Sequence, residues 1–204
     1  MKLKQSLPQV LKLWHEPKLK PLFDTGIFVV LLFASHYLYI WWANTGFYPF
    51  AHQVDQLFVF ASDILFNQSA WIVKNIFHLN HTTDGQTIWV VTNRGDWGFV
   101  EVSPGCTSLK QWMHWIFIMA LFPGPWKHKL WYIPLGVIVI HFVNIIRIVG
   151  LSLAIIPWPE HFDFFHDYIF KTFFYFMIFV MWVVWEEVFR SEGLKVLKSE
   201  GLKV

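Results

Sequence analysis

The chain has 204 residues, of which 55% are hydrophobic and 20% aromatic, and its formal net charge is +2. These fractions exceed those of ordinary soluble domains and exclude a typical water-soluble enzyme. The charge is small, and the basic residues gather near the ends of apolar runs. This pattern favours orientation in a bilayer over binding to nucleic acid. A single Cys excludes a disulfide within the chain.

The N-terminal part predicts a charged lead-in followed by a membrane span. Residues 1–23 carry five Lys among apolar residues at near-helical spacing, which is typical of a short segment lying at the membrane surface. Residues 25–43 contain no charged side chain and are long enough to cross about 30 Å of hydrocarbon. We therefore expect three parts: a basic lead-in (1–23), a membrane-embedded domain (24–190), and a tail (191–204). From the charge bias and the site residues described below, we expect the first and last parts to be cytoplasmic and the middle part to be catalytic.

Residues 54–77 form a different kind of segment, because Asp55, Asp63 and Lys74 interrupt apolar residues that recur at helical spacing. Full insertion in lipid would cost roughly 2.5–3.5 kcal/mol for each carboxylate. The pattern predicts an amphipathic helix that lies on, or dips into, the outer interface. After it, alternating apolar and polar residues within 86–103 predict a small β-hairpin outside the bilayer.

Three further apolar segments follow, at about 106–122, 130–156 and 168–189. Together with the first span they predict an all-α polytopic membrane protein. It would have about four transmembrane helices, an amphipathic helix and a small extracytoplasmic β-hairpin.

Lys and Arg counts predict the orientation, because short loops rich in these residues stay in the cytoplasm. The lead-in, the turn 123–129 and the C-terminal tail all carry them, whereas the loop 157–167 has none. The region 44–105 has two, against five acids. We therefore expect a multi-pass protein of the cytoplasmic (inner) membrane, with both termini inside and residues 44–105 and 157–167 on the outer side.

Arg147 is the sharpest single signal, because it lies inside an otherwise apolar span. A guanidinium keeps its proton, so its burial costs at least a few kcal/mol outside a protein-lined or watered cavity. Asn144 shares a broad face of the same helix. The alternative interpretation is a structural Arg that snorkels, or that pairs with Asp163 or Asp167.

Cys106 follows the turn Pro104–Gly105 at the expected start of a span. A lone Cys in an apolar protein is often just a small buried hydrophobe. A helix N-terminus, however, stabilises a thiolate. The backbone N–H groups of Thr107 and Ser108 would point outward there, as candidate oxyanion donors.

His166 heads the last span, level with Cys106 in the predicted topology. An imidazole at this point would take a proton from a thiol and return it to a leaving amine. His161, in the preceding loop, is the competing candidate. The alternative is an interfacial His with no catalytic part. A thiol, a base and a fixed cation on one membrane face predict a cysteine hydrolase or transpeptidase.

The segments VEVSPGCTSLK, NIIRIVG and FFHDYIFK resemble the exosortase/archaeosortase family, as a compact, short-chain member. The resemblance implies a membrane cysteine protease or transpeptidase with Cys106 as nucleophile. In that family pattern Arg147 would stabilise the thiolate or oxyanion, and His166 would act as acid and base. Asn144, Thr107 and Ser108 would support them.

The resemblance also implies the partners. These are exported proteins with a C-terminal sorting signal, an apolar helix with a basic end, and membrane lipids as a candidate acceptor. No cofactor, metal or nucleic acid is implied. Two departures stand out: Cys106 is followed by Thr-Ser where the family usually has Ser-Gly, and larger members have more N-terminal spans.

Two other classes remain open from the sequence. One is a non-enzymatic membrane scaffold or lipid-binding assembly factor, in which Arg147 would bind a lipid phosphate. The other is a haem or metal protein, since the chain has ten His. His36, His114 and His141 show no paired spacing across the spans, which argues against the metal class.

Overall fold

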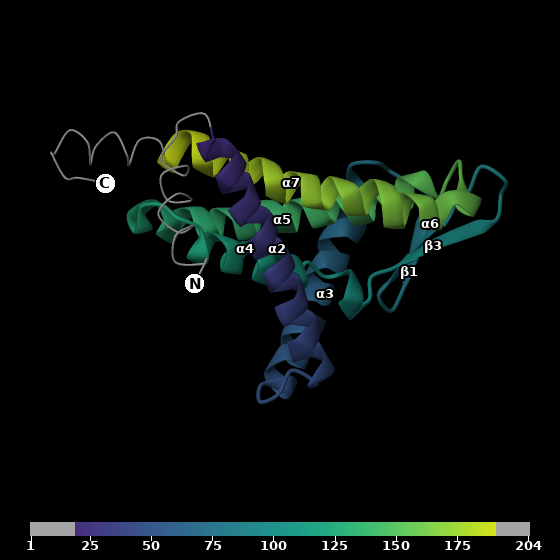
Figure 1. The fold of residues 1–204 in the computed structure, drawn as a ribbon. Helices are drawn as coiled ribbons and strands as arrows, with labels where there is room; N and C mark the ends of the chain where they lie inside the picture. Colours follow the sequence, from purple (N-terminus) through teal and green to yellow (C-terminus); the bar gives the residue numbers. More distant parts are fainter. Residues whose placement is uncertain (1–18, 191–204) are drawn as a thin grey trace, which may run out of the picture.

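The computed structural model describes residues 19–190, and their core is a small helical bundle with a β-sheet at one end (Figure 1). In chain order the elements are α2 (Lys20–Asn44), α3 (Ala51–Asn75), β1 (His81–Asp84), β2 (Thr87–Val91), β3 (Trp97–Glu101), η1 (Pro104–Cys106), α4 (Leu109–Leu121), α5 (Trp126–Ala154), η2 (Pro159–His161), α6 (Phe162–Phe164), η3 (Phe165–Phe170), α7 (Lys171–Val184) and η4 (Trp185–Arg190).

Three helical segments among these residues are long and apolar enough to cross a membrane: Lys20–Asn44, Trp126–Ala154 and Pro159–Phe189. They lie close to the predicted spans 25–43, 130–156 and 168–189. The chain is thus an integral membrane protein with several candidate spans. The lead-in as far as residue 18 and the tail 191–204 lie outside the described residues.

The predicted second span, 106–122, is corrected by the structure. Helix α4 has 13 residues and is about 20 Å long at 1.5 Å per residue, whereas a bilayer core measures about 30 Å. The helix begins at Leu109, because Pro104 starts a tight turn that holds Cys106 outside it. The C-terminal part of α5 packs against the sheet.

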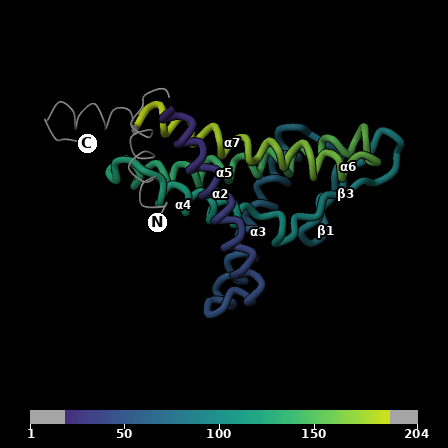
Figure 2. Tube along the Cα trace, viewed as in Figure 1, coloured from purple at the N-terminus to yellow at the C-terminus, as the bar shows by residue number. Residues whose placement is uncertain are grey.

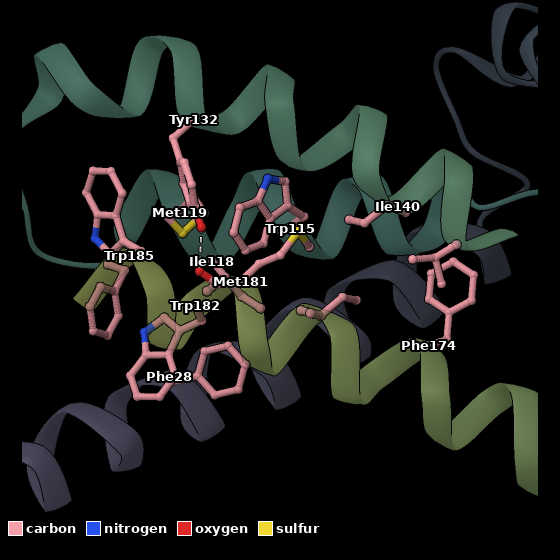
Figure 3. Packing of buried hydrophobic residues seen from close by; sticks show 13 residues of the cluster. Phe28, Trp115, Ile118, Met119, Tyr132, Ile140, Phe174, Met181, Trp182 and Trp185 are labelled. Atoms are coloured by element: carbon pink, nitrogen blue, oxygen red, sulfur yellow. Dashed lines mark hydrogen bonds between the residues drawn. The ribbon is translucent and has the colours of Figure 1, made fainter. Parts of the chain in front are cut away.

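The bundle core joins α2, α4, α5 and α7 through large aromatic side chains (Figure 3). Trp115 of α4 and Trp185 are fully buried, and Tyr132 of α5 donates a hydrogen bond to the Met181 carbonyl at 2.7 Å. Gly136 permits this packing, because a Cβ there would lie 2.0 Å from the Trp115 indole nitrogen. The aromatic layer fixes α4 against α5 and so sets the position of the chain that enters α4.

The predicted hairpin is part of a three-stranded antiparallel sheet in the order β1-β2-β3. The additional strand, β1, was missed because its sequence HTTD has no apolar alternation and three of its residues are exposed. The inner face of β2 and β3 packs on α5 through buried Ile88, Val90 and Val100. Gly98 lets β3 approach closely, since a Cβ there would lie 3.0 Å from Ile155.

The last helical run, Pro159–Phe189, lies antiparallel to α5 (Figure 2). Along its length 3₁₀, α-helical and π-helical turns alternate. Its N-terminal part passes from a 3₁₀ turn through α6 into the π-helical η3, which carries His166. π-Helical turns inside helices frequently occur at functional sites. The sheet and η3 lie together at the end of the bundle opposite the start of α2 and the end of the last helical run (Figure 1).

Candidate active site

Cys106 lies in the turn η1, immediately after the sheet, and its side chain is half-buried. Its Sγ lies 3.6 Å from the Glu101 carbonyl oxygen and 3.6 Å from Ser103 Oγ. The thiol therefore lies beside the last residue of β3, where a molecule bound along the sheet could contact it.

The expected helix N-terminus at Cys106 is corrected by this turn. The Cys106 N–H donates to Ser103 O at 2.9 Å and the Thr107 N–H to Pro104 O at 3.3 Å. Of the two predicted oxyanion donors, the Thr107 amide is therefore used inside the 3₁₀ turn that Pro104 opens and does not point outward. The Ser108 amide stays a predicted donor. Thr107 and Ser108 are both buried in the turn and the cap of α4.

Asn144 joins the turn to α5. Its Nδ2 donates to the Cys106 carbonyl oxygen at 2.9 Å, and its side chain is 1% exposed. This bond fixes the backbone of Cys106 at the level of Asn144 on α5. The position is about 15 Å from the end of that helix at 1.5 Å per residue.

Arg147 lies one turn further along α5 and contacts His166 across the helix pair. Its Nη2 is 2.6 Å from Nε2 of His166, while Nδ1 of His166 is 3.1 Å from Asp167 Oδ1. A guanidinium only donates, so this network assigns the proton of a neutral imidazole to Nδ1. Arg147 is also close enough to Cys106 and Asp167 for direct electrostatic interaction.

Cys106 and His166 line one pocket of about 430 Å³ at the C-terminal end of α5. Its other walls come from β3, the last turns of α5 and the segment that leads into α6: Phe99, Val100, Glu101, Ile148, Leu151, Ile155, Pro159 and Phe162. Arg147 does not line this pocket but contacts His166, which does. The structure therefore brings the thiol, the imidazole and the guanidinium to one place from three separate segments.

Two buried polar atoms at the site have no hydrogen-bond partner among residues 19–190: Nε of Arg147 and Oδ1 of Asn144. Buried polar atoms in native proteins are nearly always paired. One donor, on Arg147, and one acceptor, on Asn144, are thus left for a bound molecule or water.

The competing residue His161 is exposed and lies 3.8 Å from Glu160. It is not among the residues that line the pocket with Cys106.

Two supporting residues were missed from the sequence. Phe162 stacks on the His166 ring, with ring centroids 5.8 Å apart and an interplanar angle of 17°. Gly150 allows the ring of Phe170 to pack against α5, because a Cβ added to Gly150 would lie 2.5 Å from Cζ of Phe170. A glycine inside the apolar NIIRIVG helix was the available signal, since such a residue often marks close packing.

Similarity to known proteins shows the family of this chain. A family model described as transmembrane exosortase (Exosortase_EpsH) matches residues 19–184. The chain belongs to the transmembrane exosortase family. Exosortases are generally cysteine transpeptidases. The match contains all three segments that carry Cys106, Arg147 and His166 and confirms the resemblance seen in the sequence. No match was found among curated proteins or among solved structures.

Proposed function

We propose that this exosortase is a cysteine transpeptidase that processes C-terminal sorting signals of exported proteins at the outer face of the cytoplasmic membrane. The observation that carries the proposal is the shared pocket of Cys106 and His166, with Arg147 2.6 Å from the imidazole. A guanidinium at this depth needs a protein-lined polar environment, and the site supplies one.

The proposed reaction begins with proton transfer from the Cys106 thiol to Nε2 of His166. Sγ then bonds to the carbonyl carbon of the scissile peptide, and the carbonyl oxygen becomes an oxyanion. Arg147 stabilises this negative charge. Its Nε–H, which has no hydrogen-bond partner among residues 19–190, is the donor that we assign to this role.

The resting contact between Arg147 and His166 fits this sequence. The guanidinium holds the imidazole in the Nδ1–H tautomer, so Nε2 keeps its lone pair. When the substrate carbonyl attracts the guanidinium, Nε2 is released to accept the thiol proton. Asp167, which accepts from Nδ1 at 3.1 Å, stabilises the imidazolium that forms.

Collapse of the intermediate breaks the C–N bond, and His166 protonates the leaving amine. A thioester on Cys106 remains. An acceptor nucleophile, or water, attacks the thioester carbon and gives its proton to His166, and Sγ leaves and is reprotonated. Membrane lipids are a candidate acceptor. Confinement of enzyme and substrate to one membrane depth favours the attack geometry.

The experiment is processing of a co-expressed exported reporter with a C-terminal apolar helix and a basic end. The variants Cys106→Ala, Arg147→Ala and His166→Ala should each accumulate uncut precursor. His161→Ala is the matched control for His166, because it removes an exposed outer imidazole outside the pocket, and it should process normally. Full processing by Cys106→Ala would end the enzyme proposal and favour a scaffold.

A further inference from the structure

The pocket beside Cys106 is bounded on one side by the free edge of the sheet. Within residues 19–190, β3 pairs with β2 on one side only. Backbone atoms of an edge strand that point away from the sheet are unpaired hydrogen-bonding groups, and another extended chain can pair with them.

The register shows which residues of β3 point outward. Val102 N–H donates to Gln86 O at 2.9 Å, and Thr92 N–H donates to Asp96 O at 2.9 Å. Antiparallel strands alternate between bonded and non-bonded pairs, and Ile88 faces Val100 in this register. The even-numbered residues of β3 therefore bond to β2, and Phe99 and Glu101 direct their N–H and C=O groups to the free edge.

The nucleophile lies on this same edge. Cys106 Sγ is 3.6 Å from the Glu101 carbonyl oxygen, which confirms that this carbonyl points outward. A chain paired with Trp97–Phe99 would therefore meet the thiol at the next position, opposite Glu101.

We propose that the peptide substrate binds as an added fourth strand on the free edge of β3, with its scissile bond delivered to Cys106. This inference rests on the proposed function and specifies how the site holds its substrate. Pairing of an extended peptide with an exposed sheet edge draws affinity from backbone hydrogen bonds and specificity from pockets for alternate side chains.

The side-chain preference follows from the same geometry. Successive residues of a strand point to opposite faces, and Gly98 and Val100 of β3 face α5. Alternate residues of the added strand would face the same way, toward the apolar wall of Ile148, Leu151 and Phe162. We therefore expect apolar side chains at every second position of the peptide.

The test uses the purified full-length chain and two thiol reagents. One is iodoacetamide, and the other is a mixture of tetrapeptide chloromethyl ketones with apolar residues at alternate positions. Both are attacked by the Cys106 sulfur, with loss of iodide or chloride, but only the second can pair with β3. We expect the peptide reagents to alkylate Cys106 faster than iodoacetamide does.

The variants Phe99→Pro and Phe99→Ala both lose the ring, but only Phe99→Pro loses the outward N–H. Relative to Phe99→Ala, Phe99→Pro should lower the rate advantage of the peptide reagents by about tenfold, the size expected for one or two hydrogen bonds. Thr83→Pro is the matched control, because Thr83 occupies an outward position on the opposite edge, opposite Ile88. It should keep the full advantage.

A second measurement does not depend on Cys106 or on the folding of a proline variant. In Cys106→Ala, unreactive methyl ketone analogues should slow amide hydrogen exchange in residues 97–101. Analogues N-methylated at the pairing amides should not do so. Three results would each overturn the inference: no protection of residues 97–101, protection by the N-methylated analogues, or an unchanged rate advantage in Phe99→Pro. Edge-to-edge pairing of two copies of this chain would also overturn it. Protection of 97–101 together with full reporter processing by Cys106→Ala would instead leave the edge site standing and remove the proposed function.

Discussion

Gly150 of α5 lies against Phe170 of η3, and a Cβ on Gly150 would lie 2.5 Å from Cζ of that ring. The two residues sit on the same elements as Arg147 and His166. The close approach therefore sets the separation of the helices that bring the guanidinium to the imidazole.

Gly150→Ala should weaken processing by displacing η3 from α5. Overpacking of this kind typically costs about 1–3 kcal/mol, and here the displacement would lengthen the contact between Arg147 and His166. We expect more uncut reporter in Gly150→Ala and recovery in the double variant Gly150→Ala/Phe170→Ala, which removes the clashing ring.

Gly136→Ala serves as the comparator, since its Cβ would meet fully buried Trp115 far from the site. It should lower the thermal unfolding temperature of the detergent-solubilised protein more than Gly150→Ala does. Equal processing by Gly150→Ala and the parent chain would show that this contact does not position His166.

Asn144→Ala should impair processing without abolishing thiol reactivity. The substitution removes the donor to the Cys106 carbonyl and leaves that oxygen without its partner, a loss of about 1–3 kcal/mol for a buried group. We expect slower reporter cleavage, while iodoacetamide still labels Cys106 at a rate within a few fold of the parent. Asn144→Asp keeps the shape but lacks the donor, so it should behave like Asn144→Ala. Normal processing by Asn144→Asp would exclude a positioning role for this bond.

Lys129→Met should destabilise the bundle. The buried Lys129 amine donates to Phe122 O at 2.5 Å and Ala120 O at 3.3 Å, and it caps the C-terminal end of the short helix α4. Hydrogen bonds to a charged group contribute about 1.5–3 kcal/mol, so the unfolding temperature should fall by several degrees.

The neighbouring Lys127 is exposed and provides the matched control. Lys127→Met removes the same charge from the same turn and should leave the unfolding temperature nearly unchanged. If both variants unfold at the same temperature, the cap on α4 contributes nothing measurable.

Arg94→Ala should have little effect on stability. Arg94 Nη2 lies 2.9 Å and 3.0 Å from the two carboxylate oxygens of Glu160 and joins the sheet to the loop before α6. Both side chains are exposed, 62% and 46% respectively, and such pairs contribute about 0–1 kcal/mol. We expect near-normal processing and a small fall in unfolding temperature that vanishes at high salt. A large loss of processing in Arg94→Ala, restored by the exchanged pair Arg94→Glu/Glu160→Arg, would show that the bridge holds the loop over the site.

The sequence by itself determined the class of the protein and the identity of its candidate site residues. Apolar runs of about 20 residues without charged side chains indicate membrane spans. The free-energy cost of a guanidinium within such a run indicates that it has a function. Lys and Arg bias predicted which segments share a membrane face, so Cys106, Arg147 and His166 could be grouped before any coordinates were known. Local patterns of this kind act over one helix or one turn and can be recognised in a single segment.

Only the tertiary structure decided how these residues meet. The apolar run 106–122 predicts a full span, yet Pro104 starts a turn, Asn144 fixes that turn against α5, and the helix that follows is short. β1 has no apolar pattern and becomes a strand by pairing with β2. The free edge of β3 beside Cys106, the π-helical turn at His166 and the Gly150–Phe170 contact all depend on segments far apart in the chain. Backbone pairing and close packing between such segments leave little trace in the pattern of any one of them.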